Sequence, residues 1–190
     1  GHFPVEKFKG IEPPFYYYDT ALLRKTLENI NQEAGKYTNF RVHYAIKSNA
    51  NPQVVKEICQ AGLGVDCVSG GEILAALAAG FSPQHIVFAG VGKSDWEIQL
   101  GLDKDIFCFN VERIPELEVI NEWAAEKGKI AQVCFRINPN VDAHTHSNIT
   151  TGVAENKFGI AMEDMEDLVN KASQMPHVRF NGLHFHIGSQ

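Results

Sequence analysis

Apolar residues along the chain follow two alternating spacings. Short runs rich in β-branched and aromatic residues are separated by longer segments in which apolar residues recur every three or four positions. The first spacing predicts strands and the second predicts amphipathic helices. The predicted strands are Val42–Lys47, Gly64–Ser69, Ile86–Gly90, Asp105–Asn110, Ile130–Asn138 and Phe180–Ile187. The predicted helices are Thr20–Ala34, Pro52–Ala61, Gly71–Ala79, Asp95–Gly101, Ile114–Lys127 and Met162–Gln174.

Strands and helices follow one another in turn, mostly with short links between them. This alternation predicts an α/β fold with parallel strands and right-handed crossovers. An open doubly wound sheet and a closed barrel both satisfy the pattern, but no G-x-G-x-x-G signature of the dinucleotide-binding sheet follows the first strand. A complete (β/α)8 barrel takes about 250 residues. Six units in 190 residues therefore favour a TIM-type barrel that is truncated after about six strands.

Polar residues interrupt several strands near their carboxyl ends. Because strand side chains alternate between two faces, Lys47, Arg136 and His186 lie opposite the bulky apolar face of their strands. Asp66 faces away from its apolar neighbours in the same way. Ligands of barrel proteins bind at the carboxyl ends of the strands, so these four side chains are predicted to converge there. Each one alone is equally well explained as a satisfied interior group, and His184, one layer deeper, is expected to be a core histidine.

Composition narrows the classes of partner. A hydrophobic content of 44% supports a buried core, and a net charge of −6 without a Lys/Arg-rich stripe argues against nucleic acid and membrane surfaces. Apolar runs such as Ile86–Val91 are too short to cross a bilayer, and no secretory signal is recognisable. The cysteines form no C-x-x-C pair and are interpreted as reduced core thiols, which fits a cytoplasmic protein; they are Cys59, Cys67, Cys108 and Cys134.

Lys47 in its predicted strand raises a chemical question. An unpaired buried ammonium is costly, so it requires a charge partner, loss of its proton or covalent conversion. Lysine amines in desolvated pockets form Schiff bases with pyridoxal phosphate, which makes covalent conversion a specific possibility.

Four stretches carry a resemblance to a known family. They are YAIKSNANP, GVDCVSGGE, FRINPNVDAHTHSNITTGVAENKFGI and GLHFHIGSQ, and together they span nearly the whole chain. The set resembles the N-terminal part of fold-type III pyridoxal-phosphate enzymes, and most closely the diaminopimelate decarboxylase family. The resemblance implies pyridoxal 5′-phosphate as cofactor and decarboxylation of meso-2,6-diaminopimelate to L-lysine, in lysine biosynthesis. The alternatives are a related decarboxylase of arginine, ornithine or carboxynorspermidine, an alanine racemase, a non-catalytic barrel that binds this cofactor, and a cofactor-free barrel.

The same resemblance implies roles for five residues. Lys47 would carry the cofactor covalently and His186 would stack on its pyridine ring, so these two are the expected catalytic residues. Ser189 would bind the cofactor phosphate. Asp66 and Arg136 match polar residues near the ring and the lysine, and they are expected to contribute to cofactor binding.

Other polar residues have ordinary explanations. Glu72 opens a predicted helix, where a carboxylate is favourable in any case. The spacing of His144 and His146 could suggest a metal, but no acidic or cysteine partner is evident nearby, so no metal site is expected. Both lie in a long segment without clear periodicity, and such loops are often functional. By the resemblance, Thr145–Lys157 is expected to border the active site.

The resemblance also predicts the organisation of the chain. Residues 1–18, with Tyr16, Tyr17 and Tyr18, are expected to supply a strand to a separate β-domain, and residues 19–190 to form the incomplete cofactor-binding barrel domain. The complete family has a glycine-rich phosphate loop, a carboxylate that pairs with the pyridinium nitrogen, and a cysteine-bearing segment donated across a homodimer. None of these is found in the sequence, so this chain alone is expected to be inactive or nearly so.

Overall fold

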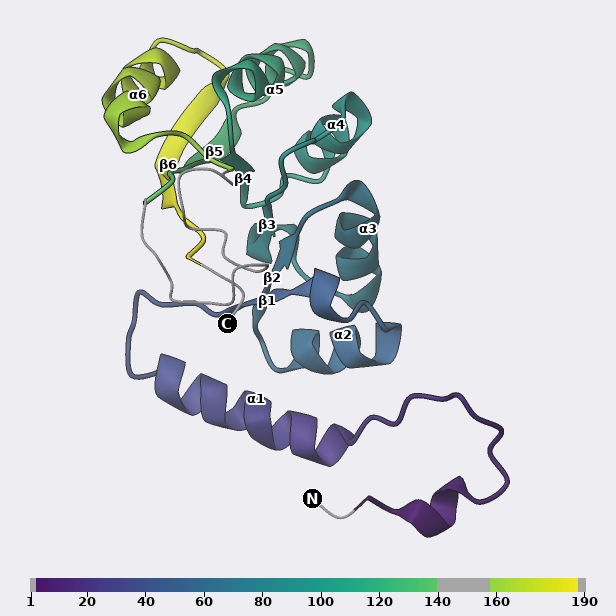
Figure 1. The fold of residues 1–190 in the computed structure, drawn as a ribbon. Helices are drawn as coiled ribbons and strands as arrows, with labels where there is room; N and C mark the ends of the chain where they lie inside the picture. Colours follow the sequence, from purple (N-terminus) through teal and green to yellow (C-terminus); the bar gives the residue numbers. More distant parts are fainter. Residues whose placement is uncertain (1–2, 140–157, 188–190) are drawn as a thin grey trace.

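Six parallel strands form the centre of the molecule (Figure 1). The structure is a computed structural model that describes residues 3–139 and 158–187. The strands are β1 (His43–Ala45), β2 (Gly64–Cys67), β3 (Ile86–Phe88), β4 (Cys108–Val111), β5 (Ala131–Arg136) and β6 (Val178–His184). Each strand pairs in parallel with the next one in the chain, so the sheet order is β1-β2-β3-β4-β5-β6. This order is that of a TIM-type barrel, and it excludes a doubly wound sheet, in which the strand order reverses.

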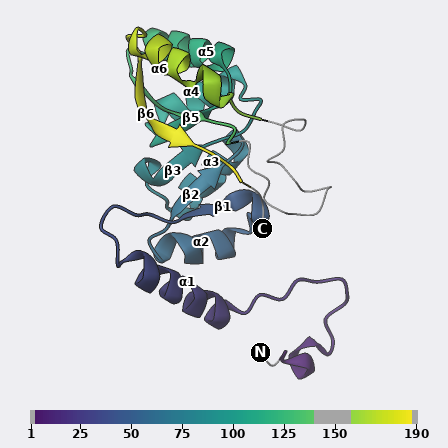
Figure 2. The same cartoon turned by 60° about the vertical axis from the view of Figure 1, so that its left-hand side comes forward.

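Helices connect the strands and cover one face of the sheet (Figures 1 and 2). They are α1 (Thr20–Ala34), α2 (Pro52–Gln60), α3 (Gly70–Ala79), α4 (Asp95–Asp103), α5 (Ile114–Glu126) and α6 (Met165–Ser173). Short 3-10 turns are η1 (Val5–Phe8), η2 (Ile46–Ser48), η3 (Pro83–His85) and η4 (Met162–Asp164). The α/β prediction is confirmed, and every predicted helix is found. None of the helices in residues 3–139 and 158–187 is long and apolar enough to cross a membrane.

Helices α1, α2 and α4 begin where polar side chains cap their first turns. The Asp19 carboxylate accepts a hydrogen bond from Leu22 N at 3.0 Å, and Asn51 caps α2 through Gln53 N in the same way. Ser94 and Glu97 form a capping box at the start of α4. Such caps satisfy backbone donors that the helix itself cannot, which stabilises a helix by about 1 kcal/mol.

The core lies between the helices and the strand residues that face them. Phe88 and Phe135 on the strands and Ile73 and Ile120 on the helices are all 0% exposed. Each such side chain stabilises the fold by roughly 1.5–3 kcal/mol through its burial. The opposite face of the strands is thereby left to form the interior of the barrel.

The first strand is shorter than predicted. It ends at Ala45, and Lys47 lies in the 3-10 turn η2. Asn49 N donates to the Ile46 carbonyl at 3.1 Å, and the Ser48 hydroxyl donates to the Ala45 carbonyl at 2.8 Å. These local hydrogen bonds turn the chain out of the sheet before Lys47, so strand alternation does not determine the direction of its side chain.

The sheet has two open edges. The described residues pair β1 only with β2 and β6 only with β5. Apolar residues of the last strand and its continuation remain exposed, among them Leu183 at 47% and Phe185 at 57%. The start of this strand is covered, since Val178 is buried, whereas Leu183 and Phe185 near its end are not covered by the described residues.

Candidate cofactor site

A cavity of about 320 Å³ lies at the carboxyl ends of the strands. Its lining comes from the ends of β1, β2, β3, β5 and β6 and from the segment after β5, and consists of Lys47, Asp66, Val68, Ala89, Gly90, Val91, Arg136, Phe158, His184 and His186. A volume near 300 Å³ is at the lower end of the range found for small-molecule sites. The predicted convergence of Lys47, Asp66, Arg136 and His186 at this end of the sheet is confirmed.

Lys47 reaches the cavity from the turn after β1. The residue is exposed rather than buried, so the expectation of a buried ammonium is wrong for this structure. The reason is the tight turn, which places the amine at the rim of the cavity. An amine at this rim is open to an aldehyde that enters from solvent.

Asp66 lies in the middle of the cavity lining, in β2. Burial raises the pKa of its carboxyl group to about 6, although the positive charge of Lys47 works in the opposite direction. Its Oδ1 atom is buried and has no hydrogen-bond partner among the described residues. A buried oxygen without a partner is costly, so a ligand that brings a donor or a positive charge fits this position.

Arg136 ends β5 and is held from two sides. Its Nη1 atom donates to Glu112 Oε1 at 2.7 Å, and the guanidinium carbon lies 5.7 Å from the centre of the Phe158 ring. Gly159 packs against its backbone, where an added Cβ would lie 2.9 Å from the Arg136 carbonyl oxygen. The guanidinium is therefore fixed before any ligand binds.

His184 at the end of β6 and His186 two residues later both line the cavity. Burial, together with the positive charge of Arg136, lowers the pKa of His186 and lowers that of His184 to about 4. Both imidazoles are therefore neutral near pH 7. His184 was expected to be a core histidine, and the structure corrects this, because its side chain lines the cavity and its buried Nδ1 atom has no partner among the described residues.

Carboxylates from the first turns of the helices hold the loops around the cavity. Glu72 Oε2 accepts from Val68 N at 2.7 Å, and Glu116 Oε2 accepts from Glu112 N at 2.9 Å. The Glu72 contact is local and structural, in agreement with the ordinary explanation of this residue. Sequence reasoning missed Glu112 and Lys93, because the buried contacts of both residues are made to distant parts of the chain.

Some predicted residues cannot be placed. Ser189, His144, His146 and the segment Thr145–Lys157 lie outside the described residues. No group of three or more His, Cys, Asp or Glu in residues 3–139 and 158–187 could hold a metal ion. The four cysteines form no disulfide in this structure.

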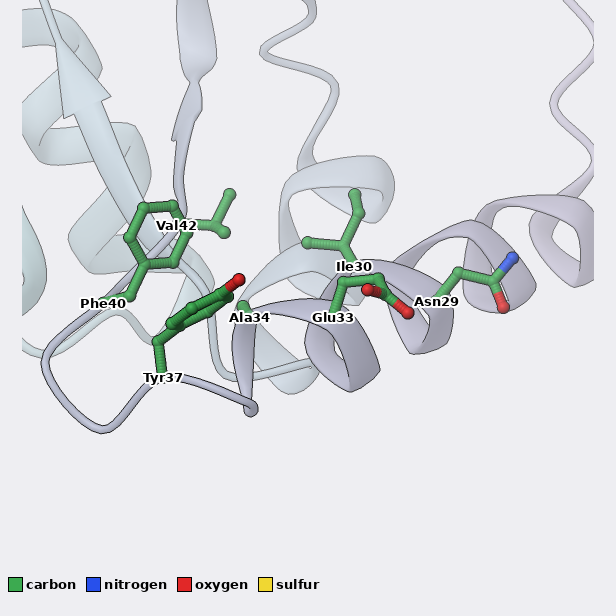
Figure 3. A pocket seen from close by; sticks show the side chains of 7 residues that line it. All are labelled: Asn29, Ile30, Glu33, Ala34, Tyr37, Phe40 and Val42. Atoms are coloured by element: carbon green, nitrogen blue, oxygen red, sulfur yellow. The ribbon is translucent and has the colours of Figure 1, made fainter.

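A second cavity of about 670 Å³ lies between α1 and the loop that leads to β1 (Figure 3). The rings of Tyr37 and Phe40 form one wall, with their centres 6.3 Å apart, and Val42 lies beside them. The one carboxylate in the lining, Glu33, is paired with Lys36 at 2.5 Å. This cavity is larger than the one at Lys47, but its walls are mostly apolar, and the described residues that line it include no lysine, histidine or cysteine.

Several known proteins are similar to this chain in sequence and structure. A diaminopimelate decarboxylase of Bacteroides thetaiotaomicron is 65% identical over 190 residues, which are 100% of this chain and 49% of that relative. The crystal structure of a mutant of diaminopimelate decarboxylase from Helicobacter pylori complexed with L-lysine matches with a TM-score of 0.92 and 40% identity, over 98% of this chain and 47% of that chain. The Paramecium bursaria Chlorella virus arginine decarboxylase matches with a TM-score of 0.73 and 26% identity, over 87% of this chain and 42% of the other.

The chain spans about half the length of the curated relatives it matches. Residues 21–190 match the family model described as the pyridoxal binding domain of pyridoxal-dependent decarboxylases. That range contains every residue that lines the cavity at Lys47. The family model names the same cofactor, pyridoxal, that the sequence predicts. The chain therefore belongs to the pyridoxal-dependent decarboxylase family, in its pyridoxal binding domain.

Proposed function

We propose that the full-length protein containing this chain is a diaminopimelate decarboxylase, which releases carbon dioxide from meso-2,6-diaminopimelate and forms L-lysine. The observation that carries the proposal is the meeting of Lys47, Asp66, Arg136 and His186 in one cavity. The 65% identity with a diaminopimelate decarboxylase supports this substrate.

The residues of the cavity fit pyridoxal 5′-phosphate. An exposed primary amine at the rim can take an aldehyde, and neutral imidazoles can lie against an aromatic ring. The buried Oδ1 of Asp66 and Nδ1 of His184 lack partners among the described residues, which is expected where a polar ligand belongs. When bound, this cofactor supplies an electron-poor ring that accepts the electrons left at the α-carbon of an amino acid.

Each residue then has a distinct task. Lys47 holds the cofactor covalently through Nζ, and the same atom, when free, can hold a proton beside the substrate. His186 would lie against the ring of the bound cofactor, and Arg136 and Asp66 would supply charges near it. Ser189 binds the phosphate. All five assignments are proposals, supported by the matching motifs and, for the first four residues, by the cavity lining.

Three further features of the whole protein are proposed. Residues 1–18 contribute a strand to a second, β-rich domain; the exposed Tyr16, at 89%, is available for such packing. A homodimer completes the active site, as the family resemblance implies. A cytoplasmic location is supported by four cysteines that are free thiols.

The activity is tested by measuring carbon dioxide and lysine formation by the full-length protein and by this chain. We expect turnover of meso-2,6-diaminopimelate by the full-length protein only, and little or none of arginine, ornithine or carboxynorspermidine. Full activity of the 190-residue chain would overturn the assignment of an incomplete site. Turnover of arginine instead would favour the second group of relatives, represented by the viral arginine decarboxylase. Stable cofactor binding without any turnover would identify a non-catalytic pyridoxal-phosphate protein.

A further inference from the structure

We propose that Glu112 is a positioning residue that holds the Arg136 guanidinium at the cofactor cavity and balances its charge there. The inference rests on the proposed function, in which Arg136 lies beside the bound cofactor. Glu112 itself does not line the cavity, so it acts through Arg136.

The contact between the two side chains is close and buried. Glu112 Oε1 accepts from Arg136 Nη1 at 2.7 Å, and the side chains are 1% and 13% exposed. Glu112 Oε2 is also buried and has no hydrogen-bond partner among the described residues. A buried carboxylate with one unsatisfied oxygen is retained at a cost in free energy, and Arg136 is the cation that compensates for it.

Glu112 is itself held in place. Its backbone N–H donates to Glu116 Oε2 at 2.9 Å, and Glu116 Oε1 lies 2.6 Å from the ammonium of Lys93. That ammonium also donates to the carbonyl oxygens of Gly90 and Asn110, each at 2.8 Å. The carboxylate that meets Arg136 is therefore anchored to the loops after β3 and β4, which is the rigid support that a precise site needs.

The negative charge of Glu112 affects the pKa of His186 in the cavity lining. The pKa of His186 is lowered by burial first, then by Arg136 and Lys47, whereas Glu112 raises it. Without Glu112 the guanidinium would be uncompensated and free to turn. Both the orientation of Arg136 and the charge around the cofactor ring would then change.

The test is a double-mutant cycle in the full-length protein, using Glu112→Gln, Arg136→Gln and the double variant. Pyridoxal 5′-phosphate affinity is measured by absorbance titration. We expect Glu112→Gln to raise the dissociation constant about tenfold, and the double variant to bind no more weakly than Arg136→Gln alone. Additive losses in the double variant would overturn the inference.

The matched control is Glu97→Gln, which changes a carboxylate to an amide in the first turn of α4. Glu97 accepts from Gly70 N at 2.7 Å and from Ser94 N at 2.9 Å and does not contact Arg136. We expect this variant to keep the affinity of the wild type within about twofold. Equal losses in Glu97→Gln and Glu112→Gln would show that Glu112 is only structural.

A second readout does not depend on the cofactor. In the cofactor-free protein, NMR titration of His186 is expected to give a lower pKa in Glu112→Gln and an unchanged one in Glu97→Gln. If the wild type binds no pyridoxal 5′-phosphate, the proposed function fails while this titration still tests the charge balance.

If Glu112→Gln does not fold, the comparison of the double variant with Arg136→Gln still decides, because the double variant leaves no buried charge unpaired. An unchanged His186 titration in folded Glu112→Gln would contradict the proposal.

Discussion

The ammonium of Lys93 lies 2.6 Å from the Glu116 carboxylate, and the lysine side chain is only 1% exposed. This pair joins the loop after β3 to the first turn of α5, next to the cofactor cavity. Three oxygen acceptors surround the ammonium, from Glu116, Gly90 and Asn110. A buried charge with a complete set of partners stabilises the fold only as long as every partner remains.

Removing one member of this pair should be strongly destabilising. We expect Lys93→Met or Glu116→Gln to lower the free energy of unfolding by about 3–5 kcal/mol, because each leaves a buried group unpaired. Urea denaturation measures the change. Lys127→Met is the comparison, since Lys127 pairs with the half-exposed Asp103 at 2.7 Å and should cost less than about 1 kcal/mol. Equal losses in the buried and the exposed pair would contradict this account.

Gly101 in α4 is predicted to reject alanine. A Cβ at this position would lie 2.7 Å from Phe109 Cζ, and Phe109 is 2% exposed and cannot move aside. We expect Gly101→Ala to destabilise the protein by about 1–3 kcal/mol through overpacking. Gly71→Ala, in a helix with only Ser69 Oγ near at 3.8 Å, should be neutral or stabilising by up to about 1 kcal/mol. Thermal unfolding measures both variants, and a Gly101→Ala protein more stable than Gly71→Ala would contradict the prediction.

The raised pKa of Asp66 predicts a pH-dependent stability. The pKa of its carboxyl group is about 6 in the folded chain, compared with the ordinary value of 3.8 in the unfolded chain. Between these values the folded state binds more protons, so the contribution of Asp66 to stability falls as pH rises from about 4 to about 6. Asp66→Asn should remove this component, so its stability relative to the wild type should increase over the same pH range. Chemical denaturation at pH 4, 5, 6 and 7 provides the comparison, and a constant difference between the two proteins would refute the prediction.

Lys47 is expected to be the site of covalent cofactor attachment. In the full-length protein, Lys47→Ala should abolish the borohydride-reducible label that peptide mapping finds on this residue. Lys56→Ala is the control, because Lys56 is an exposed lysine on α2 outside the cavity. Cofactor that stays covalently bound in Lys47→Ala would mean that another lysine carries it.

Much of the fold follows from local pattern. The helix Thr20–Ala34 has the predicted bounds, because Asp19 caps its first turn and the apolar spacing continues to its end. The six strands are also found, but β1 stops before Lys47, where side-chain and backbone hydrogen bonds form a turn that apolar spacing does not reveal. The prediction therefore places Lys47 at the correct cavity, although the turn and not strand alternation sets the direction and exposure of its side chain.

The missed residues of the site share one physical cause. Glu112 and Lys93 are buried through contacts with residues 23 or 24 positions away, so their environment depends on how the strands assemble. The depth of His184 in its strand predicts a core residue, whereas β6 at the sheet edge leaves its ring in the cavity lining. A charged residue in sequence does not indicate which loop will supply its partner.

Because each strand pairs with the strand just before it, the chain can assemble in the order in which the ribosome delivers it. A nascent polypeptide that has emerged as far as β3 already contains every neighbour that β1 and β2 have in this sheet. Contacts of short sequence separation favour rapid folding, and domains form from the N-terminal end during synthesis. The ion pair of Glu112 and Arg136 is completed only when β5 arrives, so the cofactor cavity takes shape only after β1 to β4 have been synthesised.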